Sequence, residues 1–500
     1  FLREAGECEY DQGGYFIIDG QEKVLVTRQE QSFNAVHISH KPTDDMPTKA
    51  AINTLGAGTR EKRFVGIFIA KGGQIYVQLP MLRMPVPLFV VYRAMGFQSD
   101  EEIVKCIFPD VTTPEAELLT QYLMPSIYEA APFFDQRTAV QYITTITKRR
   151  SPAMVMDILY NLMFTHVSNH DGDDIDINKA KAGILMRAKG FYLGDTIRKI
   201  LRVHHGLDKQ TDKDDTRNQR VYVGGALVQR LFSEVYSEFI KKMLLKYDET
   251  YNIAQDAYQG EKFVELLANY TNQSRAISYT YITDYLLYSF RGKWGMIGKD
   301  RTVNQNVEGV LQALSRLTYL DFVSHTRRVV LDFDTTRKLV GPRRMHSSQF
   351  GYFCAVETPG GASIGVVKNL AMMTKVSFYL NPEPINQWLL NRGNVIALHK
   401  TSAVQRAKWI PIYVNSEWLG VCENPLPLIA ILKLFKWTGC FSPYISVSFS
   451  FINRALYVYT DEGRPLRPLW HVHPDYVWQH YGLGRHSDEI DTERFAHKIS

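Results

Sequence analysis

The residues best suited to chemistry are cationic side chains that gather between Arg316 and His346. Eight of them fall within 31 residues, offset by three aspartates. An arginine guanidinium presents its N–H groups as a planar fork that can bind two phosphate oxygens at once, so the segment could hold a nucleic-acid backbone. A solvated basic surface would have the same composition, and charge alone does not separate the two. The cationic residues are Arg316, Arg327, Arg328, Arg337, Lys338, Arg343, Arg344 and His346.

A second candidate follows directly, in the stretch GYFCAVETPGGASIGVVKNLA from Gly351 to Ala371. It holds four glycines, one glutamate, Glu357, and one lysine, Lys368. Glycine permits positive φ angles and close approach of another backbone, and Pro359 fixes its own φ. The stretch therefore predicts a rigid turn that carries one acid and one base.

Three other segments superficially resemble ligand-binding loops. In RGKWGMIGKDR the glycines miss the spacing of a phosphate-binding loop, and Asp300 replaces the metal-binding hydroxyl. GAGTRE at Gly56 has Glu61 in place of the third glycine of a dinucleotide fingerprint. The run HVSNHDGDDID, residues 166–176, lacks the ligand order of a calcium loop and is interpreted as a solvated acidic loop.

The elements around these segments follow from local patterns. Asp19-Gly20 between two apolar runs predicts a hairpin over Tyr15–Val26, and residues 63–82 alternate as strands do. Ser99 is placed to cap a helix, with Glu102 positioned to reach back. Residues 115–203 have mostly helical spacing, and VGGALVQRLFSEVYSEFIKKMLLKY predicts another helix after a polar boundary at 208–220.

The segment before the basic run also has helical spacing. Its apolar residues recur on one helical face, which predicts a helix through VNQNVEGVLQALSRLTYL. They are Val303, Val307, Val310, Leu314 and Leu317. Beyond Leu370 the sequence changes to short strands and turns with several Trp and Pro residues, which predicts another boundary there.

Composition bounds the class of protein. The 500 residues are 45% hydrophobic and 22% charged, which predicts a globular chain of about three domains. The net charge of +6 is small, so a polyanion would have to bind local patches. Five scattered cysteines without a Cys-x-x-Cys pair favour a reducing compartment and argue against a zinc ribbon. There is no long apolar run or signal-peptide layout, so we expect an intracellular portion of a longer polypeptide.

The order of residues in GPRRMHSSQFGYFCAVETPGGASIGVVKNLA closely resembles the signature of the second-largest subunit of multisubunit DNA-dependent RNA polymerases. This family includes the bacterial beta subunit and its eukaryotic, archaeal and viral counterparts. The matching positions are Pro342, Arg343, His346, Gly351, Cys354, Glu357, Thr358, Pro359, Gly361, Gly365, Lys368, Asn369 and Leu370.

Three further blocks resemble the family in the same order along the chain. GGYFIIDGQEKVLV is similar to its N-terminal hairpin, and DDTRNQRVYVGG to an Asp-x-x-x-Asn-Lys-Arg segment matched at Asp214, Asn218 and Arg220. LYVYTDEGRPLRPL matches a later pattern. Its positions are Thr460, Asp461, Gly463, Arg464, Arg467, Pro468 and Leu469. LTYLDFVSHTRR is also similar to the segment that borders the rifampicin pocket in the bacterial enzyme.

Two departures limit what the resemblance implies. Gly360 stands where the family has a second glutamate, and Ala355 stands where a proline follows the cysteine. The role of that second acid in nucleotide handling is therefore not carried over. The divergence is compatible with a polymerase from a large DNA virus. The Asp332–Asp334 pair in LDFDTT lacks the flanking residues of the family's catalytic aspartate triad.

The resemblance implies a mixed α/β (α+β) multidomain fold with protrusion, lobe, fork and external regions. It implies the end of the protrusion at 1–20, the lobe at 21–217, the returning protrusion at 218–280, and the fork at 281–370. The first external region would span 371–470 and the second would start at 471–500.

The implied function is that of a DNA-directed RNA polymerase subunit that forms part of the active-centre cleft, a nucleotidyltransferase active only with the largest subunit. The alternative is a noncatalytic nucleic-acid-binding scaffold derived from such a subunit. The resemblance implies that the catalytic residues lie mainly in the largest subunit and beyond Ser500. Mg²⁺ would likewise be held mainly by the largest subunit, with no zinc in this portion.

The resemblance also implies partners and a location. The partners would be the largest and smaller subunits, DNA, the RNA–DNA hybrid and nucleoside triphosphates, without a membrane. The location would be the nucleus, or the host cytoplasm or virion for a virus.

Roles of single residues follow from the same resemblance. The expected nucleic-acid contacts are Arg327, Arg328, Arg337, Lys338, Arg343, Arg344 and His346, and the expected active-centre supports are Glu357, Gly361 and Lys368. A buried ion pair between Glu357 and Lys368, which would order the turn without touching substrate, remains an alternative.

Overall fold

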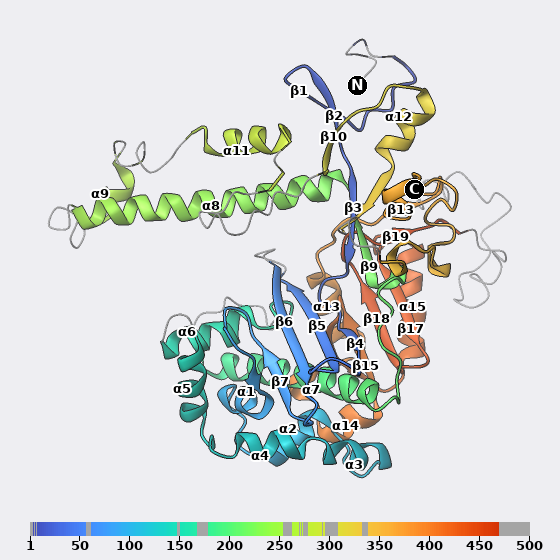
Figure 1. Ribbon diagram of the computed structural model, residues 1–500. Helices are drawn as coiled ribbons and strands as arrows, with labels where there is room; N and C mark the ends of the chain where they lie inside the picture. The colour runs from blue at the N-terminus through green and yellow to red at the C-terminus, as the bar shows by residue number, and fades with distance from the viewer. Residues whose placement is uncertain are drawn as a thin grey trace. The chain divides into compact units, whose positions relative to one another are not determined.

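A computed structural model describes the chain in two compact units (Figure 1). The described residues are 4, 6, 8–56, 62–147, 151–167, 179–253, 263–269, 271, 273, 279–292, 294–295, 309–332 and 339–469. The first unit combines residues 1–30, 219–376 and 462–467, and the second combines 31–218, 377–461 and 468–500. Each unit is therefore assembled from segments that lie far apart in the sequence. The mixture of helices with several small sheets is the fold class predicted from the sequence.

In its described residues the first unit contains a three-stranded sheet, a four-stranded sheet, a separate pair of strands and a long helix. β1 (Phe16–Ile18), β2 (Gln21–Leu25) and β10 (Leu311–Ala313) form one sheet. β12 (Val367–Asn369), β11 (Arg328–Leu331), β3 (Thr27–Gln31) and β9 (Gln219–Tyr222) form the other, in that order. The strands β13 (Lys375–Val376) and β19 (Pro465–Leu466) make a separate pair. The helices are α8 (Gly224–Ile253), α9 (Phe263–Ala268), α11 (Tyr281–Phe290) and α12 (Tyr319–Thr326).

The N-terminal hairpin forms as predicted. β1 pairs with β2 in antiparallel register, with Ile18 opposite Gln21. Asp19 and Gly20 between them have φ angles of 51° and 76°. These left-handed conformations are those that a tight hairpin turn requires, and Asp and Gly tolerate them. The predicted helix after the polar run is also confirmed, as α8.

The helix predicted around Val310 is wrong in its described part. Gly309 has a φ of 78°, and residues 311–313 form β10, which pairs with β2 so that Leu311 lies opposite Leu25. Val310 is buried, and its carbonyl accepts a hydrogen bond of 2.8 Å from the Val26 amide. An unpaired edge of β2 outweighs the weak helical periodicity of so short a run. Val303 and Val307 lie outside the described residues.

The second unit contains two five-stranded sheets. The first has the order β4 (His37–His40), β5 (Thr48–Leu55), β6 (Lys62–Ile69), β7 (Ile75–Gln78) and β8 (Val86–Pro87), all antiparallel. Helices follow it in the sequence and pack on its apolar core. They are α1 (Leu88–Ala94), α2 (Asp100–Ile107), α3 (Pro114–Gln121), α4 (Met124–Ala130), α5 (Gln136–Ile146), α6 (Pro152–Asp157) and α7 (Lys179–His204). The strands and helices expected over residues 63–82 and 115–203 are thus confirmed, whereas residues 168–176 of the supposed acidic loop at 166–176 lie outside the described residues.

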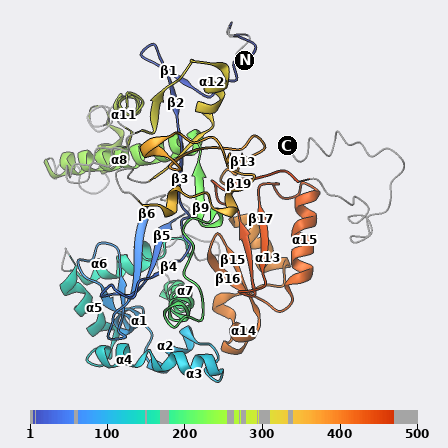
Figure 2. The same cartoon turned by 45° about the vertical axis from the view of Figure 1, so that its right-hand side comes forward.

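The second sheet of this unit has the order β14 (Ile396–Ala397), β16 (Glu417–Cys422), β15 (Ile410–Val414), β18 (Ala455–Tyr459) and β17 (Ser446–Ser450). Figure 2 shows α13 (Glu383–Arg392) and α15 (Pro425–Trp437) beside these strands, and α14 (Ala403–Lys408) precedes β15. The expectation of only short strands and turns beyond Leu370 is therefore incomplete. The run PLPLIAILKLFKW is a helix that buries Leu428 and Leu432.

Helix α2 begins as its sequence predicts. The Ser99 side chain accepts a hydrogen bond of 3.1 Å from the Glu102 amide, and the Glu102 carboxylate accepts one of 3.3 Å from the amide of Gln98. The first contact satisfies an amide that the first turn of a helix leaves without a partner, and the second satisfies the amide of the residue before the N-cap. The second therefore reaches one residue further back than a capping box does.

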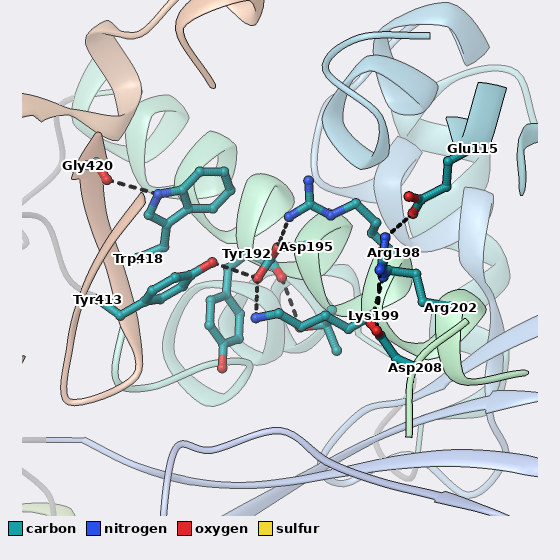
Figure 3. Close-up of polar contacts among 11 residues, drawn as sticks. Glu115, Tyr192, Asp195, Arg198, Lys199, Arg202, Asp208, Tyr413, Trp418 and Gly420 are labelled. Atoms are coloured by element: carbon teal, nitrogen blue, oxygen red, sulfur yellow. Dashed lines mark hydrogen bonds and ion pairs between the residues drawn. The ribbon is translucent and has the colours of Figure 1, made fainter. Parts of the chain in front are cut away.

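A buried carboxylate links α7 to the second sheet (Figure 3). Asp195 is 3% exposed and accepts a hydrogen bond of 3.0 Å from the hydroxyl of Tyr413 on β15. Arg198 and Lys199, one turn further along α7, each lie 2.6 Å from its oxygens. Burial would raise the pKa of Asp195, but the two cations and these hydrogen bonds lower it to about 2.

Candidate nucleic-acid interface

The sheet of β3, β9, β11 and β12 positions the segment that carries the candidate site. β11 runs parallel to β3 and antiparallel to β12, so that Val329 lies opposite Lys368. Val329, Val221 and Phe353 form the small apolar core of this region. The basic segment therefore reaches the Gly351–Ala371 stretch through direct strand pairing.

Arg327 and Arg328 begin this arrangement, but they are engaged within the chain. Arg327 follows α12, and its guanidinium donates a hydrogen bond of 2.6 Å to the carbonyl of Ala371. Arg328 on β11 lies 4.0 Å from the carboxylate of Asp321, and both side chains are 28% exposed. Each is partly exposed, but each also contributes to holding the loops.

Arg343 holds the turn through hydrogen bonds to its backbone. Its guanidinium donates to the carbonyls of Ala362 and Ile364, the latter at 3.1 Å. Gly365 has a φ of 70°, and a Cβ there would lie 2.1 Å from the carbonyl oxygen of Arg343. The two backbones are in contact, so the Pro-Arg and Gly parts of the signature fit each other through packing.

Arg344 and His346 differ in their exposure. Arg344 is exposed. His346 caps a short 3₁₀ helix, where its Nδ1 accepts a hydrogen bond of 3.2 Å from the Ser348 amide and lies 2.7 Å from the Ser348 hydroxyl. Arg344 is therefore the described cation of this stretch best placed to meet a partner. Arg337 and Lys338 lie outside the described residues.

The acid and the base of the turn do not form a buried pair. Glu357 is exposed, and its carboxylate accepts a hydrogen bond from the hydroxyl of Ser324 on α12. Lys368 on β12 is only 8% exposed, and its ammonium lies 5.6 Å from the centre of the Phe353 ring. The buried-pair alternative is wrong because Glu357 faces solvent.

Thr358 holds the turn together through hydrogen bonds, and Gly361 supplies a left-handed backbone conformation within it. The Thr358 hydroxyl donates a hydrogen bond of 3.0 Å to the Val367 carbonyl and accepts one of 2.9 Å from the Gly365 amide. Gly361 has a φ of 81°, but a Cβ there would meet nothing within 4 Å. Its glycine is therefore needed for backbone conformation and not for close approach.

Two cations, Arg467 beside this turn and Arg220 beside Gly463, were matched as family positions, but sequence reasoning did not place them in the site. A Cβ on Gly351, which has a φ of 82°, would lie 2.3 Å from the Arg467 guanidinium. The Val221 amide, next to the buried Arg220, donates a hydrogen bond of 2.7 Å to the Gly463 carbonyl. The signal that could have found them is that each lies in a block shared with the family.

Arg316, the first cation of the basic segment, has a structural role. Its guanidinium contacts the Glu22 carboxylate at 2.9 Å and the Asp11 carboxylate at 3.2 Å. A hydrogen bond from Arg316 is the main cause of the lowered pKa of Glu22. Because Glu22 lies on β2, Arg316 ties the N-terminal hairpin to the segment before α12.

The described residues do not offer a metal site. They contain no group of three or more His, Cys, Asp or Glu side chains that could hold an ion. The donor set therefore does not fit Mg²⁺, and we assign no metal-dependent step to these residues. No described helix is long and apolar enough to cross a bilayer.

The expected position of the catalytic residues stays a prediction. Residues 470–500, which include Ser500 and the whole segment 471–500 expected to start the second external region, lie outside the described residues. The placement of catalytic residues in the largest subunit and beyond Ser500 therefore rests on the family resemblance alone.

Family models match most of the chain. Residues 2–268 match the model described as RNA polymerase beta subunit. Residues 312–376 and 412–473 match those described as domains 3 and 4 of RNA polymerase Rpb2.

Similar proteins are also named as subunits of DNA-directed RNA polymerases. DNA-directed RNA polymerase II subunit 2 of Arabidopsis thaliana is 31% identical over 491 residues, which are 94% of this chain and 38% of the relative. Subunit RPB2 of RNA polymerase II from Encephalitozoon cuniculi is 29% identical over 488 residues, 94% of this chain and 39% of the relative. RNA polymerase III subunit RPC2 of Schizosaccharomyces pombe is 25% identical over 471 residues, 93% and 38%.

The chain spans about two fifths of the length of these relatives. The family model covers more than half of the chain, and the four sequence blocks occur in the family's order. In the structure, residues of all four blocks lie in the first unit, and the later three lie beside the β3, β9, β11 and β12 sheet. The chain belongs to the RNA polymerase beta subunit family.

Proposed function

We propose that this chain is a portion of the second-largest subunit of a DNA-directed RNA polymerase and helps to form the cleft that holds DNA and the RNA–DNA hybrid. The observation that carries the proposal is the convergence of three of the four family blocks on one sheet, beside which Arg344 is exposed. A cation there can neutralise backbone phosphates of any sequence. The relatives are subunits of DNA-directed RNA polymerase II by name, which supports the polymerase activity.

Catalysis is assigned to the assembled enzyme. The described residues offer no Mg²⁺ site, so we propose that the largest subunit holds the ion, as the family resemblance implies. Held there, the ion would supply Lewis-acid assistance to nucleotidyl transfer, and no described residue of this chain is assigned to that step. The contribution of this chain is to hold nucleic acid through positive charge and to keep the turn at Gly351–Ala371 rigid. A cellular enzyme would act in the nucleus, and a viral one in the host cytoplasm or virion.

The test is purification of the native complex with an affinity tag on the protein. We expect the largest subunit and smaller subunits to copurify, and the complex to extend RNA on a DNA template. The protein without partners should not extend RNA. A complex that binds nucleic acid but contains no largest subunit and extends no RNA would favour the noncatalytic scaffold instead.

A further inference from the structure

A cleft in the second unit lies between the helices α2 and α7 and the segment that includes α14. Its volume is about 380 Å³, within the size range of sites that take small molecules or a few side chains. Phe97 and Phe191 contribute apolar surface to its lining. The cleft is thus part apolar and part charged, and it lies outside the nucleic-acid interface described above.

The charges that line this cleft do not balance. Lys105 pairs with Glu101 at 2.5 Å, and Arg187 lies 3.9 Å from Glu102. The remaining cation is Arg406 on α14. Among the residues that the structure describes, no carboxylate pairs with Arg406.

Arg406 is held in place by contacts within the chain. Its guanidinium lies 4.1 Å from the centre of the Phe191 ring, and Nη1 donates a hydrogen bond of 2.9 Å to the Thr401 carbonyl. Its Nε is buried and has no hydrogen-bond acceptor among the described residues. Nη1 also lies 3.4 Å from the Thr401 hydroxyl. Fixing an arginine by stacking and by these hydrogen bonds leaves less conformational entropy to lose when an anion binds.

The neighbouring thiol does not supply the missing negative charge. Cys106 also lines the cleft, and burial raises the pKa of its thiol to about 12, so it stays neutral at physiological pH. Burial in turn lowers the pKa of Arg406, which reflects the cost of a half-buried cation without a counter-ion. An anion from outside would remove that cost.

We propose that this cleft binds an acidic peptide segment of a partner protein, with a carboxylate on Arg406 and an adjacent apolar side chain against Phe97 and Phe191. A single carboxylate fits the single excess charge. A nucleic-acid strand is less suitable, because its successive phosphates would approach the carboxylates of Glu101 and Glu102 at the same cleft. The partner is therefore recognised by acidic and apolar residues in alternation.

The binding test uses the purified protein and a short fluorescein-labelled peptide of alternating phenylalanine and glutamate. A matched peptide has glutamine in place of every glutamate. We expect the glutamate peptide to bind at least about tenfold more tightly, since a hydrogen bond between charged groups is stronger than one from the neutral amide of glutamine. Equal affinity of the two peptides would overturn the proposal.

Two variants assign the preference to Arg406. Arg406→Gln should abolish it, whereas Lys408→Gln, which removes an exposed charge of the same sign from the same helix, should leave it unchanged. Retention of the preference in Arg406→Gln would overturn the assignment. Urea unfolding curves check that the Arg406→Gln and Lys408→Gln proteins are folded. If Arg406→Gln unfolds, Arg406→Lys serves in its place and should reduce the preference several-fold, because lysine lacks the planar fork.

Competition distinguishes the source of the anion. An unlabelled glutamate peptide should displace the probe, whereas inorganic phosphate or single-stranded oligothymidylate at matched ionic strength should not. Displacement by oligothymidylate that is as effective as displacement by the peptide would identify the cleft as a nucleic-acid site. Equal displacement by phosphate would show a simple anion site. Either result would contradict recognition of an acidic peptide.

Discussion

Gly361 and Gly365 lie four residues apart, and both have positive φ angles, but they are glycine for different reasons. The first has open space where a side chain would extend, whereas a Cβ on the second would lie 2.1 Å from the Arg343 carbonyl oxygen. The sequence pattern assigns glycine to both positions but does not distinguish a conformational requirement from a steric one. Only the fold of the preceding loop, which brings Arg343 to Gly365, makes the distinction.

The two glycines should therefore respond differently to substitution. Gly361→Val should cost about 1 kcal/mol or more through its positive φ alone. Gly365→Ala should cost more than that, because the added methyl group meets backbone that cannot rotate away. Gly360→Ala is the control, since Gly360 has an extended conformation and open space around it. Urea denaturation measures the free energy of unfolding of the three variants. A Gly365→Ala protein as stable as Gly360→Ala would contradict the packing argument.

The arginines should also separate into two groups. Arg344→Ala should lower the slope of log affinity for DNA against log salt by about 0.9 in the assembled enzyme, since one phosphate contact is lost. Arg343→Ala should instead reduce stability, because the Ala362 and Ile364 carbonyls lose their donor. Filter binding at several salt concentrations tests the first effect, and thermal unfolding tests the second. An unchanged slope for Arg344→Ala would return it to the class of solvated surface charges.

At the scale of single elements, α12 and the strands around it contain a pH-sensitive group. His325 is buried, its Nδ1 accepts a hydrogen bond of 3.1 Å from the Ser315 amide, and its Nε2 lies 3.0 Å from the Gln312 side-chain oxygen. The ring is therefore neutral and donates through Nε2. Burial lowers the pKa of His325, Arg328 lowers it further, and Asp321 opposes them.

The sign of the pH effect follows from that lowered pKa. Above the ordinary value of about 6.5 both the folded and unfolded states hold His325 neutral, so its contribution to stability is complete. As the pH falls below this value, the unfolded chain binds a proton that the folded one does not, and stability decreases. His325→Gln should flatten the dependence of the unfolding free energy between about pH 6.5 and 5. An equal slope in both proteins would exclude His325 as its source.

The connection between α7 and β15 is a second element-scale feature (Figure 3). Asp195→Asn leaves Arg198 and Lys199 without their shared carboxylate, which should cost about 3–5 kcal/mol. Tyr413→Phe removes one hydrogen bond and should cost about 1–3 kcal/mol because the carboxylate is charged. The two changes should not add in a double-mutant cycle, since they remove the same contact. Additive losses in urea unfolding would show that the contact contributes nothing.

Local sequence signals correctly predicted the elements whose conformation is determined by neighbouring residues. The Asp19-Gly20 turn and the Ser99 cap both depend on neighbouring residues, and both formed. The predicted helix around Val310 failed because pairing with β2, whose sequence is nearly 300 residues away, decided the conformation of residues 311–313. The signature similarly predicted which residues gather at the turn. It could not show that Arg327 and Arg343 donate to carbonyls while Arg344 faces solvent, since loop geometry determines this.

At the scale of the whole molecule, neither compact unit is continuous in sequence. In the second unit, residues 377–461 have an apolar core of their own, which includes Leu389, Ile412 and Val458. Leu398 and Trp418 of the same segment instead belong to the larger core that residues 31–218 build. The larger core is therefore completed by residues that are encoded about 200 positions later.

This asymmetry predicts how the second unit behaves when divided. A fragment of residues 31–218 should unfold at a lower temperature than the same region in the full chain, because it lacks Tyr413 opposite Asp195 and the apolar side chains of Leu398 and Trp418. A fragment of 377–461 should retain more of its structure, since most of its core is internal. Mixing the fragments should raise the melting temperature of the first, as any ligand selective for the folded state does. The Tyr413→Phe version of the second fragment should raise it less, which connects recovery to the buried contact. If 31–218 alone melted at the temperature of the full chain and did not respond to its partner, the two segments would be independent domains in spite of their shared core.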